Sequence, residues 1–146
     1  MRIVKIMTEK LVTVQMDDSL LLINDIFENT NFHHLLVVES NKLVGVISDR
    51  DLFKALSPNL GCVSETAKDA ATLNKKAHQI MSRDLITLSP DASAYDAIAL
   101  FNQHTVSCLP VIDENQKPLG IVSWRDILRV IEENRNKRKQ ADSEKS

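Results

Sequence analysis

Apolar and polar positions along the chain predict the same order of elements twice. In the first half, a short β-rich run at residues 11–14 is followed by a helix that begins after Ser19, a typical N-cap residue. Two strands at residues 35–39 and 43–48 come next, and a helix at 49–56 closes the half. The second half repeats this order with a strand at 85–88, a helix after Ser93, strands at 108–113 and 119–123, and a helix from Trp124 to about Glu133. The pattern therefore predicts β-α-β-β-α twice, an α+β fold.

The residues repeat as well as the elements. Gly45–Leu52 reads Gly-Val-Ile-Ser-Asp-Arg-Asp-Leu and is matched by Gly120–Ile127, Gly-Ile-Val-Ser-Trp-Arg-Asp-Ile. Upstream, Ile6-Met7-Thr8 is matched by Ile80-Met81-Ser82. A unit of roughly 50 residues is too small to bury its apolar faces alone and needs its copy as a partner. The cleft between two copies packed through their sheets is therefore the first place to expect function.

Four segments follow from this repeat. We predict a first repeat at residues 3–56, a connector at 57–77, a second repeat at 78–133 and a polar tail at 134–146. The connector starts with a turn-rich stretch and continues as a helix from about Glu65 to Ala77, for which Ser64 and Thr66 are both plausible starts. The tail has charge without periodicity, so we expect it to be disordered. Its basic residues suit a solvated helix end better than a phosphate-rich partner.

Composition narrows the class of protein. The chain has 146 residues, of which 43% are hydrophobic and 26% charged, which is typical of a soluble globular domain. A net charge of −2 gives no general attraction to nucleic acid or to an anionic membrane. The sequence has neither a signal peptide nor an apolar run of the ~20 residues that a membrane helix needs. The two cysteines, Cys62 and Cys108, lack metal-ligand spacing, so we expect reduced thiols and a cytoplasmic location.

The repeated Gly-x-x-Ser-x-x-Asp motif has two interpretations. It spans a strand end and a helix start, so serine at the N-cap and aspartate at the third helical position form a capping box, worth ~1 kcal/mol of helix stability. The same geometry also suits a nucleotide, because a helix N-terminus attracts phosphate and a carboxylate accepts ribose hydroxyls. The glycine leaves room for a close approach, and an arginine before each aspartate adds a cation. Finding the whole set twice favours the ligand, although both roles are compatible.

These residues resemble a known family. Two β-α-β-β-α copies, each opening with Ile-Met and closing with Gly-h-h-Ser-x-x-Asp (h, hydrophobic), are similar to a tandem pair of CBS domains, also called a Bateman module, over about Ile3 to Ile131. The resemblance implies a regulatory module that binds adenosine-containing ligands such as AMP, ADP, ATP, NAD or S-adenosylmethionine in the cleft between the repeats. Leu36 departs from the pattern, because the family usually has a proline where Pro110 stands in the second copy.

The resemblance also implies which residues bind the ligand. In the family, the ribose aspartate of one repeat works with the opening strand of the other. One site would contain Thr8, Lys10, Val12, Phe32, Ser123, Arg125 and Asp126, with Phe32 against the base. The second would contain Ser48, Arg50, Asp51, Ser82, Asp84, Ile86 and Val106, with Val106 against the base. His33 and His34 stand where the family often has a basic residue near the phosphates, whereas Ser107 and Cys108 hold that place in the second copy. We therefore expect two unequal sites.

Three classes of function remain open from the sequence: a ligand-sensing module acting on a partner in trans, a scaffold that keeps the CBS fold without binding a nucleotide, and a nucleotide-processing enzyme. No nucleophile with a base, paired carboxylates or P-loop supports the enzyme, and adjacent histidines in an extended chain point to opposite faces, so we expect no metal site. The adenine nucleotide would be a regulatory ligand and not a catalytic cofactor. Trp124 fits a place over the base or on the surface equally well. The wide apolar faces of the helices after Ser19 and Ser93 predict a homodimer.

Overall fold

The first ten residues of the chain fold with the second repeat. The computed structural model describes residues 1–145 and confirms the mixed α+β class. Residues 1–10 and 86–145 form one compact unit, called unit 1 here, and residues 11–85 form unit 2. The two compact units therefore meet along the sequence at 10/11 and 85/86, so each unit differs from a sequence repeat. Unit 1 therefore combines most of the second repeat with the opening residues of the first. Unit 2 combines most of the first repeat with the connector and the opening residues of the second.

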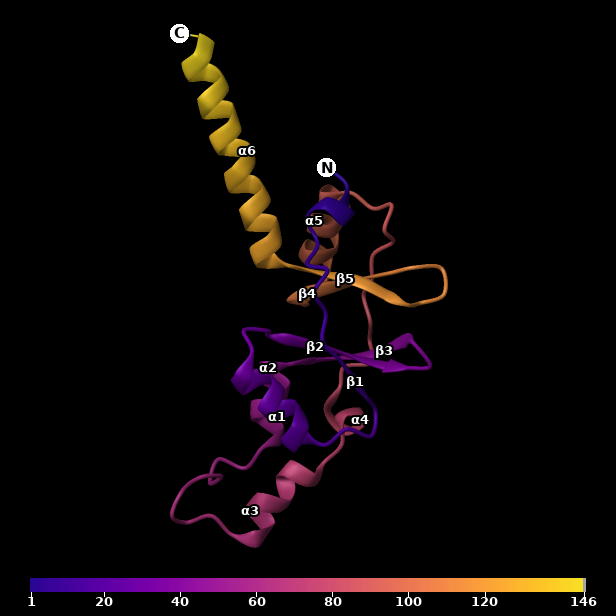
Figure 1. Cartoon of the computed structure of the whole chain (residues 1–146), viewed down its shortest axis with the longest axis vertical. Coiled ribbons are helices and arrows are strands. Elements are labelled where there is room, and N and C mark those ends of the chain that lie inside the picture. The colour runs from indigo at the N-terminus through magenta and orange to yellow at the C-terminus, as the bar shows by residue number, and fades with distance from the viewer. Residues whose placement is uncertain (146) are drawn as a thin grey trace. The chain divides into compact units, whose positions relative to one another are not determined.

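A three-stranded sheet forms the centre of unit 2. Its strands are β1 (Thr13–Gln15), β2 (His34–Glu39) and β3 (Lys42–Ser48), in the order β1-β2-β3, with β1 parallel and β3 antiparallel to β2. The four residues from Leu35 to Val38 are all buried, as a central strand requires. The helices α1 (Leu20–Asn29) and α2 (Asp49–Ala55) lie together on one side of this sheet (Figure 1). The predicted helix, strand pair and closing helix of the first half are therefore confirmed.

The connector is divided where the sequence predicts one helix. Thr66 is the N-cap of α3 (Ala67–Ala71), so the later of the two starts is the observed one. A 3-10 turn, η2 (Thr72–Asn74), follows, and α4 (Ala77–Ile80) is separate. The break occurs because the backbone at Lys75 is extended and its carbonyl accepts the N–H of Leu20 at 2.9 Å. The segment before α4 thus pairs with the chain that enters α1 and cannot continue a helix.

Unit 1 contains a two-stranded sheet and the two helices that flank it in the sequence. The strands β4 (Cys108–Ile112) and β5 (Pro118–Ser123) form an antiparallel hairpin, with α5 (Ala94–Gln103) before it and α6 (Trp124–Lys145) after it. The N-terminal segment, which contains a short 3-10 turn, η1 (Ile3–Lys5), also belongs to this unit. It is held by hydrogen bonds from the N–H of Ile3 to the carbonyl of Ala92 at 2.8 Å and between Thr8 and Ile121 in both directions. The buried core combines these parts and includes Ile3, Ile6, Ala97, Leu109, Val122 and Ile127.

The predicted strand at residues 85–88 is wrong, and its counterpart in the first repeat shows why. In unit 2, the N–H of Leu36 donates to the carbonyl of Val12 at 3.2 Å and helps to pair β1 with β2. Pro110 stands at the position of Leu36 and has no N–H to donate. Only a single bridge between Leu88 and Val111 remains, with Leu88 donating to the carbonyl of Pro110 at 2.9 Å.

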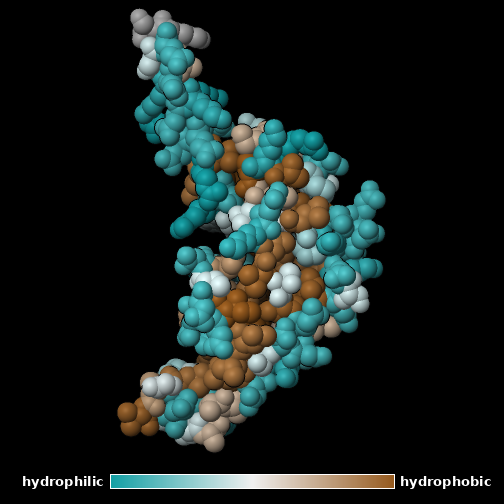
Figure 2. Space-filling model, viewed as in Figure 1, coloured by the Kyte–Doolittle hydropathy of each residue, from teal (hydrophilic) through white to brown (hydrophobic). Residues whose placement is uncertain are grey.

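The C-terminal tail is helical where the sequence led us to expect disorder. The last helix, α6, continues to Lys145, and its outer part extends away from the rest of unit 1 (Figure 1). The segment lacks Gly and Pro, and most of its residues have high helix propensity. Figure 2 shows that this outer part is hydrophilic. Its formation therefore rests on backbone propensity and not on packing. Among residues 1–145, no helix is long and apolar enough to span a membrane.

Candidate functional site

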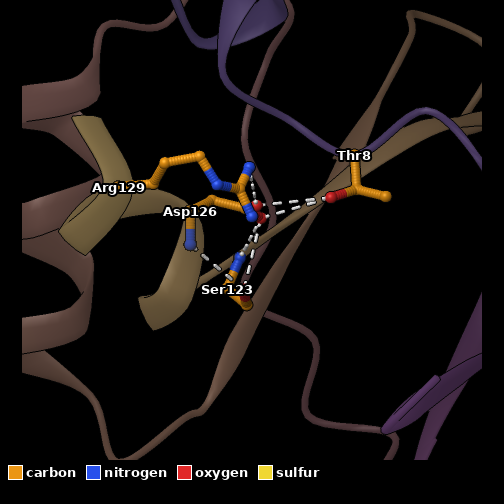
Figure 3. Close-up of polar contacts among 4 residues, drawn as sticks. All are labelled: Thr8, Ser123, Asp126 and Arg129. Atoms are coloured by element: carbon orange, nitrogen blue, oxygen red, sulfur yellow. Dashed lines mark hydrogen bonds and ion pairs between the residues drawn. The ribbon is translucent and has the colours of Figure 1, made fainter. Parts of the chain in front are cut away.

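A buried carboxylate lies at the start of α6 in unit 1. Asp126 is only 3% exposed. Its Oδ2 accepts the backbone N–H of Ser123 at 2.9 Å and the hydroxyl of Ser123 at 3.2 Å, and its own N–H donates to Ser123 Oγ at 3.4 Å. Thr8, from the N-terminal segment, donates from its hydroxyl to Oδ1 at 3.3 Å (Figure 3). The aspartate of one repeat and the opening segment before the other are thus joined within one unit.

Arg129 is a member of this cluster that our reading of the sequence missed. Its Nη1 donates to Asp126 Oδ1 at 3.3 Å, and its side chain is half-exposed (Figure 3). The signal was present, because a base three residues after an aspartate shares its helix face. The first repeat has Lys54 in the same relation to Asp51. Both copies therefore have a basic residue three positions after the aspartate, and this position belongs to the repeated motif.

The corresponding aspartate in unit 2 is more open. Asp51 forms the capping box of α2, in which its Oδ2 accepts the N–H of Ser48 at 2.9 Å and its N–H donates to Ser48 Oγ at 3.1 Å. Ser82 is brought to this strand end by a two-way backbone bridge with Val46, yet its side chain is exposed. Within residues 1–145, Asp51 receives no side-chain donor comparable to Thr8 or Arg129. The two aspartates therefore occupy unequal environments.

The glycine of each motif leaves room for a methionine. A Cβ added to Gly45 would lie 2.5 Å from the sulfur of Met81, and one added to Gly120 would lie 2.5 Å from that of Met7. Both methionines belong to the Ile-Met pair that opens a repeat. The glycines therefore admit the opening segment to the strand, and that segment then places Thr8 or Ser82 beside the helix start. The glycines were expected to allow a close approach by a ligand or by backbone. In the structure, the opening segment of the protein makes this approach.

Capping boxes occur at several helices of this chain, which bears on the interpretation of the Ser-x-x-Asp motif as a helix cap alone. Ser93 with Asp96 and Thr66 with Asp69 form the same arrangement at α5 and α3. Neither is accompanied by the glycine and an Ile-Met pair, although Ser57 donates its hydroxyl to Asp69 Oδ1 at 2.7 Å and Arg2 pairs with Ser93. The cap alone is therefore a general device for starting helices here, and what distinguishes the candidate site is the glycine with the Ile-Met opening segment against it.

The remaining predicted residues fall in both units. Lys10 and Arg125 belong to unit 1 with Thr8, Ser123 and Asp126, whereas Val12 and Phe32 belong to unit 2. For the second predicted site, Arg50 and Asp84 belong to unit 2 with Ser48, Asp51 and Ser82, whereas Ile86 and Val106 belong to unit 1. Arg50 and Arg125 are both exposed, as residues that bind a phosphate must be before the ligand arrives. Each unit thus contains five of the residues assigned to one site.

The two adjacent histidines have different surroundings. His34 pairs with Ser48 in the β2–β3 register and is half-buried. Burial lowers the pKa of His34 from its ordinary 6.5, opposed by the charge of Asp49. His33 is exposed, and its Nδ1 lies 2.9 Å from Oδ2 of Asp49. With Phe32, it lines a hollow between α1 and α2 that neither Ser48 nor Asp51 lines.

Trp124 lies at the surface of unit 1. It packs edge-to-face on Phe101, with ring centroids 6.1 Å apart and planes at 82°. Together with Ile98, Ile127 and Leu128, these rings line a shallow apolar groove between α5 and α6. Within residues 1–145, no group of three or more His, Cys, Asp or Glu side chains is arranged to hold a metal ion.

Comparison with known proteins identifies the family. The model of the CBS domain matches this chain at residues 3–58 and 77–133. The chain therefore belongs to the CBS domain family, with two copies of the domain. A crystal structure of the CBS domain pair of protein MJ0100, in complex with methylthioadenosine and S-adenosyl-L-methionine, has a TM-score of 0.76 and 26% identity. The match covers 92% of this chain and 98% of that one.

Relatives also include longer proteins. Uncharacterized protein MJ1232 of Methanocaldococcus jannaschii is 36% identical over 65% of this chain, and homoserine O-acetyltransferase of Methanococcoides burtonii is 32% identical over 86%. The chain spans 27% and 23% of their lengths. Enzymes among the relatives match through their CBS regions, and CBS pairs are generally regulatory modules that bind nucleotides or related ligands.

Proposed function

We propose that this chain is a regulatory module that binds an adenosine-containing nucleotide of the AMP, ADP or ATP class and acts on a partner in trans. The observation that carries the proposal is the same assembly in both units. A Ser-x-x-Asp helix start lies beside an opening segment that supplies a hydroxyl residue, Thr8 in unit 1 and Ser82 in unit 2. The bound methylthioadenosine and S-adenosylmethionine of the similar CBS pair support an adenosine ligand.

The chemistry of each assembly suits a ribose phosphate. The carboxylate accepts hydrogen bonds from ribose hydroxyls, while Arg50 or Arg125 offers a cation to the phosphates. Asp51 is ready for this role, because within the described residues 1–145 its carboxylate accepts one hydrogen bond, at Oδ2 from the N–H of Ser48. Asp126 must first give up Thr8 or Arg129 as a donor. We therefore propose that the site containing Asp51 has the higher affinity for the nucleotide.

Ligand-dependent thermal stability tests the proposal. A nucleotide at a hundred times its dissociation constant stabilises a protein by about 2.7 kcal/mol, so millimolar AMP, ADP or ATP should raise the Tm of the chain. Replacing Asp51→Ala should remove most of this rise, and calorimetric titration should show one fewer strong site. Asp126→Ala should remove the weaker component. An unchanged titration in Asp51→Ala would show that this aspartate does not bind the ligand.

Asp96→Ala provides a matched control. Asp96 forms a capping box with Ser93 whose bonds, 2.8 and 3.2 Å, resemble those of Asp51 with Ser48. It has the same effect on its helix, and the chain beside its cap is Met1–Ile3, which contains no hydroxyl residue corresponding to Thr8. The variant should lower the Tm by a similar amount without changing the nucleotide-induced rise. This comparison separates the loss of a cap from the loss of a ligand contact.

One observation favours the alternative, a scaffold that binds no nucleotide. Asp126 is already surrounded by donors from Ser123, Thr8 and Arg129, so it is satisfied as a structural group. If both aspartates act only in this way, the melting curve will not move with any of the adenosine ligands. In that case the apolar surfaces of the helices carry the function.

We also propose a homodimer, through the apolar face of α5 and α6. On this face Tyr95, Trp124 and Leu128 are 77%, 59% and 64% exposed, an unusual concentration of large apolar groups. The face predicted on α1 is narrower, because Leu20 and Ile23 lie in the core of unit 2. Leu128→Asp should convert a dimer into a monomer in light scattering, and a wild-type monomer at all concentrations would refute this interface.

A further inference from the structure

The hollow between α1 and α2 combines aromatic rings with carboxylates. It has a volume of about 270 Å³ and lies entirely in unit 2. Three of the four phenylalanines of the chain line it, Phe27, Phe32 and Phe53. Its acidic groups are Glu28 and Asp49. The ring of Phe53, at the edge, is 72% exposed. The fold of unit 2 thus keeps an aromatic surface in water next to two negative charges.

The second repeat shows that these charges are not needed for the fold. The groove between α5 and α6 uses the corresponding positions, with Phe101 in place of Phe27 and Ile127 in place of Leu52. There, however, Asn102 replaces Glu28, Trp124 replaces Asp49 and Leu128 replaces Phe53. The same architecture is therefore stable with a neutral, apolar lining. Phe27 packs against the core of unit 2, so what packing does not explain is the exposed ring of Phe53 and the two carboxylates.

Both kinds of side chain in the hollow attract the same class of ligand. The face of a phenyl ring carries a negative quadrupole and attracts a cation within about 6 Å of its centroid. Carboxylates attract cations directly. His33 fixes Asp49 through the 2.9 Å contact with Oδ2, and within residues 1–145 Glu28 has no ion-pair partner. The hollow is therefore suited to a positive, partly apolar group and disfavours an anion.

We infer that this hollow binds a small organic cation, an alkylammonium or guanidinium compound, between the phenyl rings and the carboxylates of Glu28 and Asp49. Phe53 forms a wall over the apolar part of the ligand, and Glu28 supplies the uncompensated charge. The hollow is distinct from Ser48 and Asp51, which do not line it, and it shares Phe32 and His33 with the residues assigned to the nucleotide.

Amide NMR spectra of the full chain, titrated with choline chloride and with ethylguanidinium chloride, test this inference. The cations should cause saturable shifts at Phe32, His33 and Phe53 in the millimolar range. The uncharged carbon isostere of choline, dimethylbutanol, should cause none, and sodium chloride at equal ionic strength corrects for screening. Equal shifts with dimethylbutanol would show an ordinary apolar groove and overturn the inference.

Two variants locate the site and one controls for surface changes. Phe53→Ala should weaken choline binding about fivefold, the loss of one cation–π contact, and Glu28→Gln should weaken it by a similar factor. Both residues are largely exposed, so both variants should fold with an unchanged Tm. Leu128→Ala, at the position of Phe53 in the second repeat, should leave the affinity for choline unchanged. Binding that survives both Phe53→Ala and Glu28→Gln, or shifts that do not saturate, would refute the site.

Discussion

The hydroxyl of Thr8 donates a hydrogen bond to Asp126 at 3.3 Å, although 118 positions of the sequence separate the two residues. The contact links the N-terminal segment to the start of the last helix and supports a carboxylate that is almost fully buried. In unit 2 the corresponding pair is Ser82 and Asp51, and the side chain of Ser82 is exposed. The two units therefore use the same backbone arrangement with different side-chain contacts.

Removing the Thr8 hydroxyl should destabilise unit 1. Thr8→Val keeps the shape of the side chain but leaves Asp126 with one donor fewer, which we expect to cost about 1–2 kcal/mol in urea denaturation. Thr8→Ser retains the hydroxyl and should cost much less. Ser82→Ala is the matched change in unit 2 and should have little effect, because the serine is exposed. Equal losses for Thr8→Val and Ser82→Ala would contradict the difference between the side-chain contacts of the two units.

The motif glycines should not tolerate a methyl group. Gly45→Ala and Gly120→Ala place a Cβ against Met81 and Met7, and overpacking of this kind costs about 1–3 kcal/mol. Combining Gly45→Ala with Met81→Ala should restore part of the loss, giving a non-additive double-mutant cycle in chemical denaturation. Gly61→Ala is a useful contrast. Gly61 has φ +77° and no atom within 4 Å of the added Cβ, so its cost should be conformational and unaffected by Met81→Ala.

Stability should fall in mild acid because of His34. Burial lowers the pKa of His34 below its ordinary 6.5, with the charge of Asp49 opposing, so the unfolded chain takes up this proton before the folded chain does. The free energy of unfolding should therefore decrease as the pH drops below about 6.5. His34→Gln should flatten this part of the profile of Tm against pH. If the slope is unchanged in this variant, another group is responsible.

The outer part of α6 should be dispensable for the stability of unit 1. Its side chains are exposed from Ile131 to Glu144, so ending the chain after Glu133 removes little buried surface. We expect the Tm to change by no more than about 2 °C, while far-ultraviolet circular dichroism shows a loss of helix. A fall of many degrees would mean that the outer helix packs on a surface, in the chain or in a second copy.

Much of the fold could be predicted because local patterns and tertiary packing agree. The caps at Ser19, Ser93 and Ser48, and the strand pair around Ser40 and Asn41, follow directly from residue types. The local pattern gave a wrong prediction where a residue distant in sequence determines the secondary structure. The strand at 85–88 is lost because Pro110 cannot donate, and the connector helix is broken because Lys75 pairs with Leu20.

The candidate site shows the same limit. The Ser-x-x-Asp motif could be found from its spacing, as could its capping geometry. Its burial could not, because spacing does not show that Asp126 is covered by Thr8 and Arg129 whereas Asp51 remains open. The exposed position of Phe53 was missed for a similar reason. A phenylalanine on a short helix suggests core, and only the three-dimensional arrangement places it at the edge of an acidic hollow.

The exchange of opening segments has a consequence for synthesis on the ribosome. Residues 11–85 of unit 2 are contiguous, so this half has all its parts once the first 85 residues have emerged. Residues 1–10 are made before unit 2, yet Ile3, Ile6 and Thr8 find their partners only after Ile121 and Asp126 have been made. Contacts so distant in sequence form slowly. Unit 1 is therefore completed after unit 2, and the nascent chain carries Ile3 and Ile6 without their core partners while residues 11–85 are made.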